Sequence, residues 1–135
     1  MKYLSLTAAF LLIAIITFAQ AQTYQLSSHI LDVSTGMPAR DVTIRLEKLN
    51  EQTNTWSFVD EKKTDENGRI NNFLSTKNEN KGIYKLTFLT SPYFRKNDIK
   101  TFYPFIEVAF EITDTNHYHV PITLSAYGYS TYRGN

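Results

Sequence analysis

The chain has 135 residues, with 14 basic and 13 acidic side chains, and 14% of its residues are aromatic. This length fits one compact domain with a real hydrophobic core, and the near balance of charges offers nothing that would attract a nucleic acid. Cysteine is absent from the sequence, which excludes a disulfide framework and a cysteine nucleophile.

The first residues of the chain differ from the rest. Met1-Lys2 is followed by an apolar run, residues 4–18, and then by Ala19-Gln20-Ala21, with small residues at the two positions that a signal peptidase inspects. The run is shorter than the roughly 20 apolar residues of a spanning helix, so a cleaved signal peptide over residues 1–21 is favoured over a membrane anchor. We therefore expect an exported, periplasmic protein whose mature domain is residues 22–135.

The mature domain reads as an all-β protein with one short helix. Short alternating runs between turn residues predict about eight strands, and their regular spacing favours a two-sheet sandwich. The predicted strands are residues 27–33, 42–49, 56–62, a strand that starts at residue 69, 82–89, 105–113, 119–125 and 129–133. Ser91 as the cap and Pro92 in the first turn predict the helix, residues 91–97.

Two positions between and within these strands carry extra information. Asp65-Glu66-Asn67-Gly68 supplies a turn with glycine where a positive φ is needed, which pins Arg69 at the start of the next strand. Pro121 lies inside a predicted strand, and a proline there implies a sheet edge or a bulge.

The candidate chemistry rests on the three histidines, His29, His117 and His119. His117 and His119 are two residues apart and would share one face of a strand, where His29 could complete a zinc site, although no carboxylate or cysteine is placed to finish it. A histidine in the core or at an interface is the simpler interpretation of His29, and Arg69 would ordinarily be a solvated surface charge. The residues alone leave these alternatives open.

Several segments carry a resemblance to a known family. The mature chain resembles the transthyretin-like family, in its enzyme branch, over nearly its whole length. The segments that carry this resemblance are Ser28-His29-Ile30-Leu31-Asp32, Gly36-Met37-Pro38-Ala39, Thr64-Asp65-Glu66-Asn67-Gly68-Arg69, Gly82-Ile83-Tyr84-Lys85, His117-Tyr118-His119-Val120-Pro121 and the closing Tyr129-Ser130-Thr131-Tyr132-Arg133-Gly134. The last four residues, Tyr132-Arg133-Gly134-Asn135, match the signature of the enzyme branch except that Asn135 stands where the family has serine.

The resemblance implies a transthyretin-like sandwich that hydrolyses 5-hydroxyisourate in urate degradation, a part of purine catabolism. It also implies a homotetramer with no cofactor and no metal, in which two dimers face each other across a channel. His29, Arg69 and His119 match the catalytic residues of the family, while His117 falls outside that set. The substrate-binding residues would come from the C-terminal strand, namely Tyr132, Arg133, Gly134 and Asn135. The alternative within the family is a carrier that binds a small aromatic ligand without catalysis.

Overall fold

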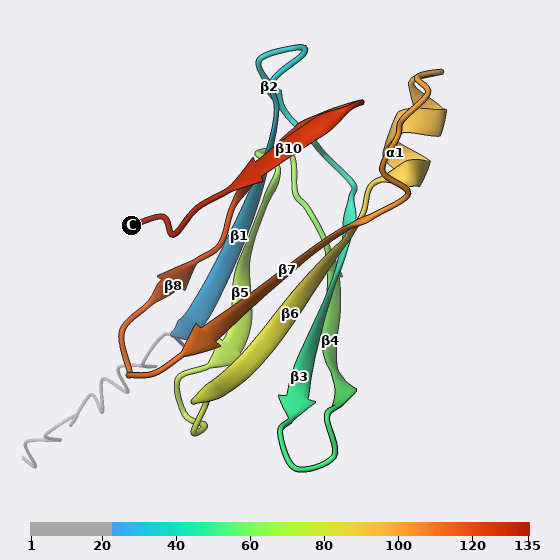
Figure 1. The fold of residues 1–135 in the computed structure, drawn as a ribbon. Helices are drawn as coiled ribbons and strands as arrows, with labels where there is room; N and C mark the ends of the chain where they lie inside the picture. The colour runs from blue at the N-terminus through green and yellow to red at the C-terminus, as the bar shows by residue number, and fades with distance from the viewer. Residues whose placement is uncertain (1–22) are drawn as a thin grey trace, which may run out of the picture.

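The computed structural model describes residues 23–135, so the predicted signal peptide, residues 1–21, lies outside the described residues. Ten strands and one helix follow one another along this part of the chain (Figure 1). Their bounds are β1 Tyr24–Asp32, β2 Met37–Pro38, β3 Thr43–Asn50, β4 Thr55–Lys63, β5 Arg69–Ser75, β6 Gly82–Leu89, α1 Ser91–Lys96, β7 Ile106–Ile112, β8 Tyr118–His119, β9 Ile122–Ser125 and β10 Gly128–Thr131.

The strands form two sheets, which confirms the predicted sandwich. One sheet has the order β10-β9-β1-β2, with β5 and β8 also paired to β1, and the other has the order β4-β3-β6-β7. Figure 1 shows β1 with β5 and β8 on either side of it. The central strand of the first sheet is therefore β1, and every strand that pairs with it can bring a side chain next to its own.

The core between the sheets follows from the alternation of apolar residues. In β1 the side chains of Leu26 and Ile30 are fully buried, and in β3 Ile44 and Leu46 face them from the other sheet's inner surface. Removing a side chain of this size from water contributes about 1.5–3 kcal/mol. Ser28 shares this inner face, whereas Ser27 and His29 belong to the outer face of the sheet, because successive side chains of a strand point to opposite sides.

The predicted strand over residues 119–125 is in fact two strands, β8 and β9, which both run parallel to β1. The break lies at Pro121, which has no N–H to give to a ladder. Hydrogen bonds from β1 hold the residue before the break: the Val120 N–H donates to the Ser27 carbonyl at 3.0 Å, and the Ser28 hydroxyl donates to the Val120 carbonyl at 2.8 Å. The ladder is therefore interrupted at Pro121, but β8 and β9 keep the same parallel register along β1.

The short helix is confirmed, but its predicted cap is wrong by one residue. Thr90 takes the cap position, and the Ser91 hydroxyl donates to the Pro104 carbonyl at 2.6 Å instead. The helix is tied to the first sheet by Tyr93, whose hydroxyl donates to the buried Asp32 carboxylate at 2.6 Å. Burial, together with this hydrogen bond, raises the pKa of Tyr93 above its usual range. Within residues 23–135 no helix is long and apolar enough to cross a membrane.

Candidate active site

The outer face of β1 supplies the first candidate residue. His29 is half-buried between the neighbouring outward positions Ser27 and Leu31, while Ser28 and Ile30 point into the core. The alternation predicted from the sequence thus places His29 on the sheet's outer face rather than in the interior. A side chain here remains open to a molecule that approaches this face.

The turn before β5 places the second candidate, Arg69. One carboxylate oxygen of Asp65 accepts the N–H groups of Asn67 and Arg69, each at 2.9 Å, which closes the turn. Gly68 has φ +69°, and its carbonyl accepts the N–H of Ile30 at 2.9 Å. An added Cβ at Gly68 would lie 2.7 Å from the carbonyl oxygen of Ile30, so only glycine allows the turn to dock on β1.

A bulge in β5 then sets which residue faces His29. Leu26 pairs with Phe73, but Ser28 pairs with Ile70, so β5 carries one more residue than β1 over this stretch. As a result His29 pairs directly with Arg69. Without the extra residue, a core position of β5 would stand opposite His29, because a one-residue slip exchanges the two faces of a strand.

The third candidate, His119, arrives from the other side of β1. It pairs with Ser27, two residues before His29 and on the same outer face. Arg69 on β5, His29 on β1 and His119 on β8 therefore occupy three adjacent strands of one sheet face. These three strands come together only through long-range pairing, which explains why the site has no spacing motif in the sequence.

The electrostatics of this face favour neutral histidines. Partial burial, followed by the positive charge of Arg69, lowers the pKa of His29, while a hydrogen bond to the main chain of Asn67 and the charge of Asp65 act in the opposite direction. Partial burial also lowers the pKa of His119, followed by Arg69 and by the charges of the other two histidines. Both imidazoles are thus available as proton acceptors near neutral pH.

His117 lies beside this group through a serine. The hydroxyl oxygen of Ser27 is 2.8 Å from Nε2 of His117 and 2.7 Å from Nδ1 of His119, and Nδ1 of His117 is 3.1 Å from the Tyr24 carbonyl. Ser27 was not singled out from the sequence, since a serine in a strand carries no signal of its own. Among residues 23–135 there is no group of three or more histidine, cysteine, aspartate or glutamate side chains that could hold a metal ion.

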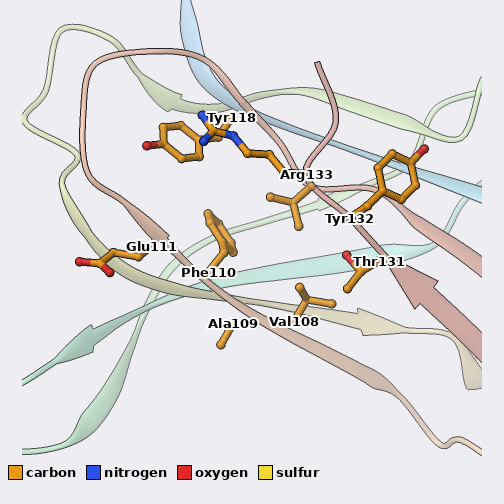
Figure 2. A pocket seen from close by; sticks show the side chains of 9 residues that line it. Val108, Ala109, Phe110, Glu111, Tyr118, Thr131, Tyr132 and Arg133 are labelled. Carbon is orange, nitrogen blue, oxygen red and sulfur yellow. The ribbon is translucent and has the colours of Figure 1, made fainter.

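The C-terminal segment divides between the two sides of the first sheet. The guanidinium of Arg133 lies over the ring of Tyr118, 4.4 Å from its centroid, and Tyr118 faces the core. Both line a hollow of about 290 Å³ between β7 and the C-terminal segment (Figure 2). In the same view Tyr132 points away from Arg133. The structure thus places the Arg133 side chain on the opposite side of the sheet from His29 and His119.

Gly134 instead contacts His119 directly. Its N–H donates to the His119 carbonyl at 2.9 Å, and the two residues form an isolated antiparallel bridge. A Cβ added to Gly134 would collide with the His119 ring. Asn135 follows as an exposed terminal residue. The end of the chain therefore lies against the imidazole of the site, and glycine is the residue that permits this close approach.

Comparisons with known proteins give the same family throughout. The model of the HIUase/Transthyretin family matches residues 26–134. The 5-hydroxyisourate hydrolase of Salmonella typhi is 43% identical over 136 aligned positions, which cover 99% of this chain and 98% of that protein.

Solved structures agree with the sequence relatives. The 5-hydroxyisourate hydrolase of Klebsiella pneumoniae superimposes with a TM-score of 0.70 at 34% identity, over 85% of this chain and all of that one. Sea bream transthyretin, solved in complex with thyroxine, superimposes with a TM-score of 0.76 at 26% identity, over 82% of this chain and 94% of that one. This chain therefore belongs to the HIUase/transthyretin family.

Proposed function

We propose that the chain is a hydrolase that opens the ring of 5-hydroxyisourate to give 2-oxo-4-hydroxy-4-carboxy-5-ureidoimidazoline. The observation that carries this proposal is the meeting of His29, Arg69 and His119 on one sheet face. Relatives that match nearly the whole chain bear the name of this enzyme. The bound substrate would be a flat, oxygen-rich purine derivative, which suits a face that offers two imidazoles and a planar guanidinium.

The reaction adds water across a cyclic amide. A neutral histidine takes a proton from water while the oxygen of that water bonds to the ring carbonyl carbon. The carbonyl oxygen gains negative charge, and the guanidinium of Arg69 donates hydrogen bonds to it. The carbon–nitrogen bond then breaks, the electron pair goes to nitrogen, and the imidazolium returns its proton there. Water is thus divided between the new carboxylate and the ureido nitrogen, and no cofactor is required.

The C-terminal residues hold the substrate in this proposal. Tyr132 and Asn135 are exposed, and Gly134 between them in the sequence brings the main chain to the edge of the His119 imidazole. Arg133 contributes from the other side of the sheet, because its contact with Tyr118 fastens the segment down. A side-chain amide such as that of Asn135 both donates and accepts, so it can contact the polar rim of the substrate.

The working form is a homotetramer. A sheet face alone is flat, whereas ligand sites are normally concave and bury most of the ligand, so a second surface must close over His29 and His119. A second copy related by two-fold symmetry provides that surface most simply. The exposed tyrosines near the C-terminus, Tyr127, Tyr129 and Tyr132, support an association at this end of the sheet.

Export completes the proposal. The apolar run of residues 4–18 and the Ala19-Gln20-Ala21 segment support a signal peptide that is cleaved after residue 21 and a periplasmic location. Mass spectrometry of the protein recovered from the periplasm would test this, since the proposal expects a chain that begins at Gln22.

Ultraviolet absorbance of freshly generated 5-hydroxyisourate tests the function itself. We expect the protein to accelerate the loss of the substrate's absorbance well above the spontaneous rate. A carrier would instead bind the molecule and leave its decay unchanged or slowed. That second outcome would favour a function like that of the transthyretin with which the chain shares its fold.

A further inference from the structure

The hydrogen bonds that link Tyr24, His117, Ser27 and His119 have a defined donor and a defined acceptor at each step. The first step is fixed because the Tyr24 carbonyl can only accept, so Nδ1 of a neutral His117 must carry the proton that points to it. The other nitrogen of that ring, Nε2, is then an acceptor. It lies 2.8 Å from the Ser27 oxygen, so the Ser27 hydroxyl donates to it.

The Ser27 hydroxyl sets the donor and acceptor roles at His119 in turn. A hydroxyl has a single proton, and Ser27 has given it to His117, so its oxygen can only accept from the second histidine. That partner is Nδ1 of His119, 2.7 Å away. Nδ1 of His119 must therefore carry the proton in the neutral ring. Its Nε2 is left with a free lone pair.

The surroundings hold the two ends of this chain in place. Ser27 is 6% exposed and sits on the central strand. The loop that carries His117 is tied to β1 by the buried Gln25, whose amide donates to the carbonyls of Asp114 at 2.7 Å and Asn116 at 3.1 Å. Asn80 in turn donates to the Gln25 amide oxygen at 3.1 Å. The loop cannot shift without breaking these bonds, so the imidazole of His117 stays within reach of Ser27.

We propose that His117, acting through Ser27, is a positioning residue that fixes the tautomer of His119 and thereby makes Nε2 of His119 the atom that accepts the proton from water. This assignment rests on the proposed hydrolysis, and it selects one of the two histidines as the base. Arg69, His29 and His117 are the charged or titratable groups that act on His119 from the elements around it. None of them occupies the role of Ser27, because only its hydroxyl joins the two rings.

A pair of variants at His117 separates this role from charge and from packing. His117→Leu removes the acceptor, so the Ser27 hydroxyl becomes free to donate to Nδ1 of His119 and to favour the wrong tautomer. We expect kcat to fall about 10- to 100-fold while KM changes less than about twofold, as the loss of one positioning hydrogen bond predicts. His117→Gln keeps an acceptor for Ser27 and a donor for Tyr24 without a titrating ring, and it should rescue most of the loss. The exposed position of His117 makes both variants compatible with folding.

The tautomer itself is measured by long-range proton–nitrogen correlation spectra of the substrate-free, nitrogen-15-labelled protein at about pH 8, where histidines are neutral. We expect His119 to be protonated at Nδ1 in the wild type and in His117→Gln, and to move toward protonation at Nε2 in His117→Leu. Because no substrate is present, this result stands even if the wild type fails to hydrolyse 5-hydroxyisourate. A failure of the proposed function is thus distinguishable from a failure of the positioning chain.

Ser27→Ala supplies the remaining arm. It removes the link between the two imidazole rings, so it should lower kcat to a similar extent. Adding His117→Leu to Ser27→Ala should lower kcat little further, because both substitutions break the same series of hydrogen bonds. Three results would overturn the proposal: a wild-type His119 protonated at Nε2, a drop in kcat for His117→Leu with no change of tautomer, or losses that multiply in the double variant.

Discussion

At the scale of single residues, Arg69 acts on both histidines as well as on the proposed substrate. Its positive charge lowers the pKa of His29 and of His119, second only to burial in each case. A lowered pKa keeps an imidazole neutral, and able to accept a proton, to a more acidic pH than the usual value of about 6.5. The acid side of the pH–rate profile therefore reports on this charge.

Arg69→Gln should move the acid limb of kcat/KM to higher pH. The charge that opposes protonation is gone, so both histidines gain their protons at a higher pH and the base is lost earlier as the pH falls. Arg69→Lys keeps the charge but not the paired donors, so it should lower the rate while leaving the acid limb near its wild-type position. Proton NMR titration of the histidines in both variants checks the direction. An acid limb that stays in place in Arg69→Gln would mean that Arg69 does not control the histidines.

Gly134→Ala should slow the reaction by about tenfold or more, because the added methyl group collides with the His119 ring and must push either the ring or the C-terminal segment aside. Gly128→Ala is the matched control. A Cβ there meets only the Ser125 hydroxyl at 3.7 Å, an ordinary contact, and should leave the rate close to that of the wild type. Equal rates for the two variants would show that the close approach of Gly134 does not position the imidazole.

At the scale of elements, alternation in the sequence was enough to predict most of the strands, though not β2 or the division into β8 and β9, and to put His29 on one face with Leu31. The Asp65–Gly68 turn was predictable as well, since glycine marks a positive φ. The bulge in β5 was not, because a bulge depends on how two distant strands pair and leaves the local pattern unchanged. The role of Ser27 could not be predicted for the same reason, because it depends on the pairing of β1 with the distant strand β8.

Gly68→Ala should lower the free energy of unfolding by about 2–4 kcal/mol, because a Cβ at this positive φ is strained and also meets the carbonyl of Ile30. Gly36→Ala isolates the strain, since Gly36 has nearly the same φ, +70°, and nothing within 4 Å of its Cβ position. We expect Gly36→Ala to lower the free energy of unfolding by about 1–2 kcal/mol. Denaturant titrations of both variants give the comparison. If the Gly68→Ala variant were as stable as the Gly36→Ala variant, the docking of the turn on β1 would be contradicted.

At the scale of the whole molecule, the two sheets have different outer faces. The outer face of the first sheet carries His29, Arg69 and His119, whereas the outer face of the second carries ion pairs such as those of Lys85 with Glu47 and Glu107, at 3.5 and 3.6 Å. These charged side chains pair with one another within the second sheet, whereas the histidines of the first sheet need a surface that closes over a bound ligand. The proposed contact between dimers therefore belongs on the first sheet, over the site.

Leu31→Glu should split the proposed tetramer and abolish turnover together, because it puts a charge on the outer face of β1 beside the site. Phe58→Glu provides the control: Phe58 is 65% exposed on β4, in the second sheet, and a charge there should leave both assembly and rate unchanged. Light scattering at the assay concentration measures the mass of the particle. A monomer with full activity would refute the requirement for a second copy.

The most direct test of the central claim is the initial rate of 5-hydroxyisourate loss with the wild type, His29→Ala and His119→Ala. A general acid or base contributes about 10²- to 10⁴-fold, so each variant should lose most of the acceleration while its circular dichroism spectrum and melting temperature stay close to those of the wild type. Added chelator should leave the wild-type rate unchanged. Near-native rates in both folded variants would contradict the assignment of catalysis to the histidines on this face.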